Sequence, residues 1–226
     1  MKNKCMTASE AVSVISDGAT IMVGGFMACG SPENLIDALI AKNPRNLTVI
    51  CNDAGVPGRG VGKLLSNGQI KKLIASHVGL NPEVAQRMNT DVAEDRLECV
   101  LVPQGTLAER VRAGGAGLGG FLTPTGVGTI VAEGKETVYV DGRAYLLEKP
   151  LRADFALLRG TVTDKFGNTT YNGTTRTFNP MMATAADYVI VGTCEIVEIG
   201  EIDPNHVVTS GIFVDAIVGG EEPWQK

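Results

Sequence analysis

Histidine and paired cysteine, the side chains that build most metal sites and disulfide frameworks, are scarce in this sequence. Its 226 residues include 2 histidines and 5 cysteines, and no two cysteines have the C-x-x-C spacing. A disulfide framework uses an even number of cysteines, and a structural zinc site needs clustered Cys and His ligands. We therefore expect free thiols, no metal ion and a reducing compartment, the cytoplasm.

Clusters of positive charge and long apolar runs are missing as well. The formal net charge is −5, whereas a nucleic-acid-binding domain usually carries a basic face. No run approaches the roughly 20 apolar residues of a membrane span. The first residues, Met1-Lys2-Asn3-Lys4, lead into a helix start rather than into the apolar core of a signal peptide. These absences predict that neither nucleic acid nor a membrane is a partner of the chain.

Glycine, with 28 residues, is the residue type in excess, and it clusters in short loops rather than in a repeat. Hydrophobic residues make up 44% of the chain and charged residues 20%, which is the mix of an ordinary globular protein. A chain of this length can bury a large apolar core without cross-links. We expect a single domain over residues 1–226, with glycines at tight turns or points of close backbone approach.

Strand and helix signals alternate through the first half of the chain. Apolar, β-forming runs predict strands at 19–23, 47–51, 70–76 and 97–102. A capping box, prolines and apolar periodicity predict helices at 7–16, 31–42, 82–88 and 107–112, the second with Ser31 as its N-cap and Pro32 at its first position. This β-α-β-α order is typical of an open, mainly parallel sheet with helices on both faces.

The second half of the sequence predicts an additional β-rich section. Asp141-Gly142 lies between two β-forming runs and predicts a hairpin with a type I′ turn. Further strands are expected at 154–158, 188–191, 196–199 and 207–209, and a short helix is expected to begin at Asn179-Pro180. Residues 114–128 are rich in glycine but also apolar, which predicts a long functional loop rather than a linker.

The segment 17–32 combines a strand, a glycine turn at Gly24-Gly25 and a helix start. In an open parallel sheet, ligands bind at the carboxyl ends of the strands, and the free N–H groups of a helix start attract anions. On these grounds alone, an anion-binding turn and an ordinary strand-to-helix turn are equally good interpretations.

The same segment resembles the first signature of the family I CoA-transferases: Asp17-Gly18, then apolar residues, then Gly24-Gly25-Phe26 and Gly30-Ser31-Pro32. Other segments that resemble alpha subunits of this family extend over nearly the whole chain. They are Asn52-Asp53-Ala54-Gly55, 74–79, 102–109, 114–128, 151–156 and Phe178-Asn179-Pro180. The chain looks most like the alpha subunits of acetate, butyrate or acetoacetate CoA-transferases.

This resemblance implies an enzyme subunit that moves CoA from an acyl-CoA to a short-chain carboxylate or 3-oxoacid by a ping-pong route. In two-subunit members, a glutamate of the beta subunit, in a Glu-x-Gly context, becomes a glutamyl-CoA thioester. Glu198-Ile199-Gly200 is the only look-alike here, and its alternating β pattern is better explained by a solvated strand residue. The resemblance thus implies a beta-subunit partner, an α2β2 assembly, and CoA as a substrate rather than a tightly bound cofactor.

The resemblance also implies that CoA is bound along the signature turn. The residues concerned are Gly24, Gly25, Phe26, Met27, Ala28, Cys29 and Gly30. Cys29 has no histidine near it in the sequence, so we expect a small buried residue there rather than a nucleophile.

Two side-chain amides follow strands of the predicted sheet. Asn52 comes after the strand at 47–51, and Gln104 after the strand at 97–102, so both are expected at the carboxyl edge. Fixed hydrogen-bond donors stabilise developing oxyanions, and the resemblance implies that these two positions contribute to, or border, an oxyanion hole. The alternative is that each amide only caps a turn. We favour a catalytic role for both, as oxyanion donors or orienting groups.

Two remaining motifs point in less specific directions. Residues 115–120 fit G-x-G-x-x-G, but they follow a predicted helix, whereas a dinucleotide fingerprint follows a strand. The resemblance implies instead a mobile loop near the CoA pantetheine or the acyl pocket. Thr177 stands where close relatives tend to carry Asn, which bears on contacts to the acid substrate.

Two other functions are compatible with glycine loops at strand ends. A sugar-phosphate isomerase or deaminase would need a complete acid–base set in one chain, and we find none in the sequence. A non-catalytic ligand-sensing domain would normally be joined to a DNA-binding helix-turn-helix, and no basic module precedes residue 7. Both are kept as alternatives to the CoA-transferase subunit.

Overall fold

A sheet of eight strands forms the body of the protein, which a computed structural model describes for residues 3–222. The parallel strands lie in the order β11-β10-β8-β1-β2-β3-β4, and β9 adds an antiparallel pair to β8. Their bounds are β1 Thr20–Val23, β2 Leu47–Ile50, β3 Ile70–Ala75, β4 Glu98–Leu101, β8 Ala153–Asp164, β9 Thr169–Thr170, β10 Ala186–Val197 and β11 Ala216–Val218. The predicted open, mainly parallel sheet is confirmed.

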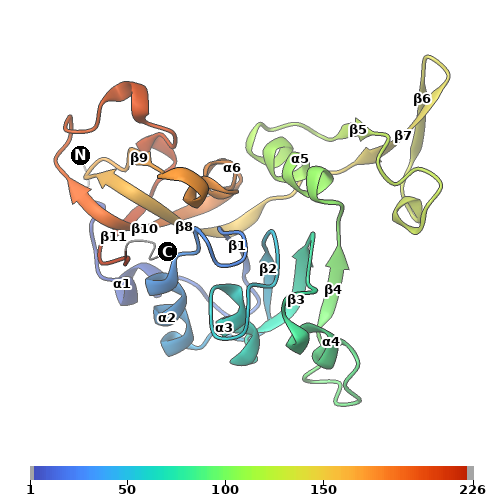
Figure 1. Cartoon of the computed structure of the whole chain (residues 1–226), viewed down its shortest axis with the longest axis horizontal. Coiled ribbons are helices and arrows are strands. Elements are labelled where there is room, and N and C mark those ends of the chain that lie inside the picture. Colours follow the sequence, from blue (N-terminus) through green and yellow to red (C-terminus); the bar gives the residue numbers. More distant parts are fainter. Residues whose placement is uncertain (1–2, 223–226) are drawn as a thin grey trace.

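Helices cover both faces of this sheet, as the sequence predicts (Figure 1). One face packs against α1 Ala8–Val12, α2 Glu33–Lys42, α3 Val61–Ser66 and α4 Pro82–Met88, and the other packs against α5 Gln104–Gly115 and α6 Asn179–Thr184. Each face has its own apolar core; Leu39 and Leu73 lie in the first, Val111 and Leu158 in the second. Full burial of such a side chain contributes about 1.5–3 kcal/mol, so the two cores hold the sheet between its helices.

A second sheet of three antiparallel strands projects from the body as an arm (Figure 1). It has the order β5-β7-β6, with β5 Phe121–Thr123, β6 Thr137–Val140 and β7 Arg143–Glu148. At the hairpin tip, Asp141 and Gly142 both have positive φ, 49° and 76°, which is the type I′ turn that the sequence predicts. We call residues 121–148 the arm.

Several predicted boundaries are wrong. Ser31 is not the N-cap of α2: Pro32 holds that place without a side-chain cap, and Ser31 is buried against Gly25. Helix α5 begins at Gln104 rather than at 107. Residues 114–128 are not one loop, because the start lies in α5 and Phe121–Thr123 is β5.

Other differences from the predicted elements are the lengths of strands that pair over long sequence separations, which local patterns do not predict, and several short additional elements. Strands β8 and β10 run in register from Ala153↔Ala186 to Asp164↔Val197. Residues 196–197 of the strand expected at 196–199 are therefore the end of β10, whereas Glu198 and Ile199 lie beyond it and are not strand residues. Residues 207–209 contribute one bridge, Thr169↔Thr209. The short helices η1 Ile130–Ala132, η2 Gly173–Arg176, η3 Pro204–His206 and η4 Gly211–Phe213, together with α3, β9 and β11, are additions to the predicted set.

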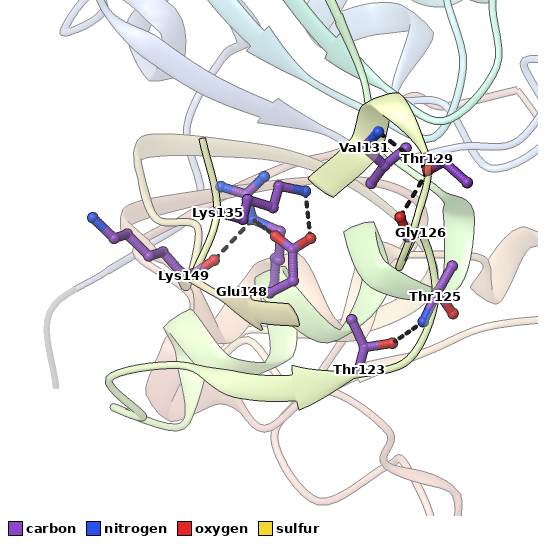
Figure 2. A network of polar contacts seen from close by, with 9 residues as sticks. Thr123, Thr125, Gly126, Thr129, Val131, Lys135, Glu148 and Lys149 are labelled. Carbon is purple, nitrogen blue, oxygen red and sulfur yellow. Dashed lines mark hydrogen bonds and ion pairs between the residues drawn. The ribbon is translucent and has the colours of Figure 1, made fainter. Parts of the chain in front are cut away.

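A buried carboxylate fastens the arm to helix α5 (Figure 2). Glu148, only 2% exposed, lies 2.5 Å from Nζ of Lys135, and its other oxygen lies 3.9 Å from Nε of Arg110. Arg110 also donates to the carbonyl oxygen of Lys149 at 2.8 Å. Because three elements converge on one carboxylate, its removal leaves two cations without their partner.

Glu148→Gln tests this attachment. We expect the free energy of unfolding to fall by about 1–3 kcal/mol, the usual cost of leaving buried polar groups unpaired, and hydrogen–deuterium exchange to rise across 121–148. Glu198→Gln is the matched control, because it breaks the exposed ion pair with Lys165, and exposed pairs contribute about 0–1 kcal/mol. Equal exchange in the arm of the Glu148 variant and the wild type would contradict the attachment.

A second buried carboxylate joins the end of the described chain to helix α2. Glu221 accepts a hydrogen bond from the backbone N–H of Asn34 at 3.0 Å, and its own N–H donates to Thr193 O at 3.1 Å. Burial raises the pKa of Glu221 to about 7, from an ordinary value of 4.5. The folded protein therefore holds this proton at pH values where the unfolded chain has lost it.

This difference fixes the sign of a pH effect on stability. The stabilisation linked to protonated Glu221 is fully present below about pH 4.5 and is lost as the pH rises towards about 7. We expect the difference in Tm between wild type and Glu221→Gln, which keeps the Asn34 hydrogen bond, to shift against the wild type from pH 5 to pH 8. A difference that stays constant over that range would refute the assignment.

Candidate functional site

The carboxyl ends of four neighbouring strands place polar groups along one edge of the main sheet. Gly24 follows β1, Asn52 follows β2, Ser76 follows β3, and Gln104 follows β4 at the first position of α5. Because parallel strands end at the same edge, residues far apart in the sequence meet there. The two amides singled out in the sequence are in direct contact.

The contact between these amides has a defined direction. Gln104 Nε2 donates to Asn52 Oδ1 at 2.9 Å, and Asn52 Nδ2 donates to Asp53 Oδ2 at 2.8 Å. Ser76 Oγ donates to the Asn52 backbone carbonyl at 2.8 Å. Gln104 is exposed, whereas Asn52 is only 1% exposed. The Gln104 side chain therefore lies at the surface, and the buried Asn52 side chain accepts its hydrogen bond from the interior side.

The signature turn is a tight hairpin closed by two backbone hydrogen bonds. Phe26 and Cys29 exchange N–H···O bonds of 2.9 Å each, and the two residues between them, Met27 and Ala28, have positive φ of 49° and 64°. Non-glycine residues in this region cost about 1–3 kcal/mol each, and such strain tends to occur at functional sites. Asp53 Oδ2 holds the turn by accepting from the Met27 N–H at 2.9 Å.

The glycines of the signature give space to side-chain and backbone groups of the protein itself. A Cβ on Gly24 would lie 1.8 Å from Asn179 Oδ1, one on Gly25 would lie 2.2 Å from Ser31 Oγ, and one on Gly30 would lie 2.5 Å from Thr175 O. Gly24, Gly25 and Gly30 are buried, as is Ala28. Within the signature turn, the side chains that reach the surface are Phe26 and Met27, 43% and 47% exposed, and the half-buried Cys29.

A pocket of about 480 Å³ opens beside this turn. It lies between the turn, the start of α5, and the segment from η2 to α6. The lining residues are Phe26, Cys29, Gln104, Gly105, Ala108, Thr174, Thr177, Phe178 and Met181. The walls are largely apolar, with the Gln104 amide among the few polar groups; no carboxylate or imidazole of residues 3–222 is among them. The pocket therefore suits a short apolar chain with a polar end.

Thr177 forms part of the pocket wall in an uncommon backbone conformation. Its φ is 34° and its ψ is −129°, which is a true outlier for a β-branched residue. Its Oγ1 accepts from Asn179 Nδ2 at 3.3 Å. The position at which the sequence departs from close relatives is thus both strained and in contact with the pocket.

Thiols of the site do not provide a nucleophile that the geometry supports. Cys51 is buried, and its burial, with the nearby Asp53 carboxylate, raises the pKa of its thiol well above the ordinary value. Cys29 Sγ lies 3.2 Å from Thr174 Oγ1, and neither histidine lines the pocket. Across the part of the chain that the structure describes, all five cysteines are free.

Neither a metal cluster nor a membrane helix is found among the described residues. Within 3–222, no three His, Cys, Asp or Glu side chains are grouped so as to hold a metal ion. In the same range, no helix has both the length and the apolar character that crossing a bilayer requires.

Two motifs of the sequence, Glu198-Ile199-Gly200 and the glycine pattern at 115–120, lie outside the pocket. Glu198 is exposed, forms an ion pair with Lys165, and is not part of the pocket. Gly114 and Gly115, inside α5, let that helix approach Leu151 and Thr184 closely. The glycine pattern at 115–120 therefore begins at the last residue of a helix, where Gly115 packs against Thr184, whereas Gly117 and Gly119 have open space beside them.

Sequence reasoning missed several residues of the site. Thr174, Phe178 and Met181 form pocket walls from a segment more than 140 positions from the signature turn. Phe178 belongs to a segment that resembles the family, but no local pattern predicts that it lines the pocket with Thr174 and Met181. Asp53 lies in the segment Asn52-Asp53-Ala54-Gly55, which resembles the family, but the sequence gives it no separate role. Its position directly after Asn52, at the end of a buried strand, is the signal that it shares the same edge.

Comparison with known proteins gives a consistent answer over almost the full length. A family model described as coenzyme A transferase matches residues 5–220. The chain is 51% identical over 222 residues to "Acetate CoA-transferase subunit alpha" of Escherichia coli, which covers 98% of this chain and 99% of that one. It is 47% identical over 218 residues to "Acetoacetyl-CoA:acetate/butyrate CoA transferase alpha subunit" of Clostridium acetobutylicum, covering 96% and 98%.

Solved structures agree on the fold. An acyl-CoA transferase from Escherichia coli, in a thioester complex with CoA, matches with a TM-score of 0.82 at 25% identity; the match covers 97% of this chain and 47% of that longer chain. Glutaconate coenzyme A-transferase from Acidaminococcus fermentans also matches with a TM-score of 0.82, at 18% identity, covering 95% and 75%. The chain belongs to the coenzyme A transferase family and is an alpha subunit of the family I type.

Proposed function

We propose that this alpha subunit acts with a beta subunit to move CoA from an acyl-CoA to a short-chain carboxylate of the acetate, butyrate or acetoacetate class. The relatives described above carry those acids in their names. The apolar pocket of about 480 Å³ is of a size that suits a short acyl chain. The relatives are transferase subunits, which supports neither the sugar-phosphate isomerase nor the ligand-sensing alternative.

The observation that carries this proposal is an outward-facing amide at the wall of an apolar pocket without a nucleophile of its own. Gln104 supplies a hydrogen-bond donor. Attack on a thioester carbonyl produces a tetrahedral oxyanion, and a hydrogen-bond donor held in place beforehand stabilises that charge. The attacking carboxylate then has to come from a second polypeptide, which is the role we assign to a glutamate of the beta subunit.

In this mechanism the alpha subunit binds and orients while the partner supplies the covalent step. The partner's glutamate attacks the acyl-CoA carbonyl and expels the CoA thiolate, which forms an acyl-glutamyl anhydride. The thiolate then attacks the glutamyl carbonyl of this anhydride, which gives the glutamyl-CoA thioester and releases the original acid as a carboxylate. A second carboxylate then takes the CoA and regenerates the glutamate. Gln104 donates to the oxyanion at each carbonyl addition, and Asn52 keeps the Gln104 amide in place.

CoA is a substrate in this proposal, and contacts to it come from the rim of the signature turn. Phe26, Met27 and Cys29 have surface to offer, whereas Gly24, Gly25, Ala28 and Gly30 shape the turn from within. Binding of the remote parts of CoA helps to lower the barrier at the thioester. An α2β2 assembly and a cytoplasmic site of action complete the proposal, and the five free thiols suit a reducing compartment.

Reconstitution from two purified chains tests whether the alpha subunit needs a beta subunit that supplies the nucleophile. Incubation of both chains with acetyl-CoA and labelled butyrate should produce labelled butyryl-CoA, and borohydride added after acyl-CoA alone should modify a glutamate of the beta chain. Each chain alone should be inactive. CoA exchange by this chain in isolation, or modification of its own glutamates, would defeat the proposal.

Substitution of the two amides tests the oxyanion role. Gln104→Ala should reduce kcat of the complex by about 10²–10³-fold, the usual loss for one oxyanion donor. Asn52→Ala should reduce it by at least about tenfold, because Gln104 loses its acceptor. Asn89→Ala is the control, because it removes an exposed amide at the end of α4 whose Nδ2 donates to Ala85 O at 2.8 Å. Unchanged kcat in both site variants, with the beta subunit bound, would rule the role out.

A further inference from the structure

We propose that Asp53 is a positioning residue: its carboxylate fixes which way the Asn52 and Gln104 amides face and so directs a Gln104 N–H into the pocket. This inference rests on the proposed function, because it concerns the orientation of the donor assigned there. It gives a role to Asp53, which the sequence places at the same sheet edge as Asn52 without assigning it a function.

The Asp53 carboxylate is buried and fully engaged as an acceptor. Asp53 is 5% exposed. Its Oδ1 accepts from Gly55 N at 2.8 Å, and its Oδ2 accepts from Asn52 Nδ2 at 2.8 Å and from Met27 N at 2.9 Å. A carboxylate has no hydrogen to donate. Whatever faces Asp53 must therefore be a donor.

Because the Asp53 carboxylate can only accept hydrogen bonds, it fixes the orientation of the Asn52 amide and, through it, that of the Gln104 amide. Because Asn52 turns its NH₂ group towards Asp53, it turns Oδ1 towards Gln104 and Ser76, whose Oγ lies 3.4 Å from that oxygen. Gln104 must then present its own NH₂ group, and Nε2 donates to Asn52 Oδ1 at 2.9 Å. The second N–H of Gln104 remains for the pocket that Gln104 lines.

The alternative orientation would be harmful to catalysis. An amide has two ends of similar size but opposite polarity. If Asn52 were free to turn over, Gln104 would be free to present its carbonyl oxygen to the pocket, and that oxygen repels an oxyanion. The buried carboxylate removes this choice without touching the substrate.

A turn-capping role alone does not explain the contacts of Asp53. The bond from Gly55 N to Oδ1 is an ordinary local cap two residues along the chain. Both bonds at Oδ2 serve the site instead: one goes to the amide of Asn52 and the other to the N–H of Met27 in the strained signature turn. Asp53 thus connects the Asn52–Gln104 pair to the signature turn, at which we place CoA.

The test uses the assembled alpha–beta complex and Asp53→Asn, which keeps the shape of the side chain but gives it a donor. We expect kcat to fall by about tenfold or more, the low end of the loss for one oxyanion donor, with KM for acetyl-CoA within about twofold, because the donor acts on the transition state more than on the ground state. Asp53→Ser, which can also donate, replaces it if the first variant fails to assemble.

Asp164→Asn is the matched control. Asp164 is also a buried carboxylate, and it accepts hydrogen bonds from groups of its own turn, namely Phe166 N, Gly167 N, Asn168 N and Asn168 Nδ2. Its substitution should lower Tm by a similar amount while leaving kcat per assembled complex unchanged. A merely structural role for Asp53 would give the same result as this control.

A double-mutant cycle separates action through Gln104 from a general effect. In the Gln104→Ala background, Asp53→Asn should lose most of its effect on kcat, because no donor remains to be oriented. Equal effects in both backgrounds, a change in KM alone, or kcat within twofold of wild type would overturn the inference. Failure of the proposed function would differ: the wild-type complex would not transfer CoA, or Gln104→Ala would keep full activity.

Discussion

One buried amide joins the parts of the chain that surround the pocket. Asn179 lies at the first position of α6, where its Oδ1 accepts from Arg159 N in β8 at 3.1 Å and its Nδ2 donates to Gly30 O and Thr175 O at 3.0 and 2.9 Å. It occupies the space that Gly24 leaves free. A buried amide with all these bonds satisfied fixes its neighbours strongly. The signature turn, β8, η2 and α6 consequently have one arrangement relative to one another.

This constraint changes the meaning of the glycine signature. Adjacent glycines at a strand end are usually explained by a ligand that approaches the backbone. Here the approaching groups are Asn179, Ser31 and Thr175 of the same chain. The signature therefore specifies a rigid turn whose outer residues, Phe26 and Met27, are free to meet a substrate or the partner subunit. Its tight spacing follows from internal packing.

The sequence predicts the main sheet well because each parallel strand is a short, apolar run bounded by helix signals. The same runs place Asn52 and Gln104 at the carboxyl edge, and their contact follows from parallel strands that end together. The pocket is a different case. Phe178 and Met181 reach it only because β8 pairs with both β1 and β10, and pairing over such separations leaves no local pattern. For the arm, the sequence predicts the hairpin at Asp141-Gly142 but not how the arm is attached, because the attachment depends on Glu148 meeting Arg110 on another element.

Backbone strain around the pocket has the same origin. Met27, Ala28 and Thr177 have positive φ without being glycine, and each costs about 1–3 kcal/mol. All three belong to segments that the buried side chains of Asp53 or Asn179 hold through hydrogen bonds. Since these bonds over-determine the backbone, the strained residues persist and keep side chains at positions where glycine would leave none. The fold thus stabilises a rim of fixed side chains. In the proposed mechanism the reacting carboxylate belongs to another polypeptide, and a fixed rim lets it meet its target in one geometry.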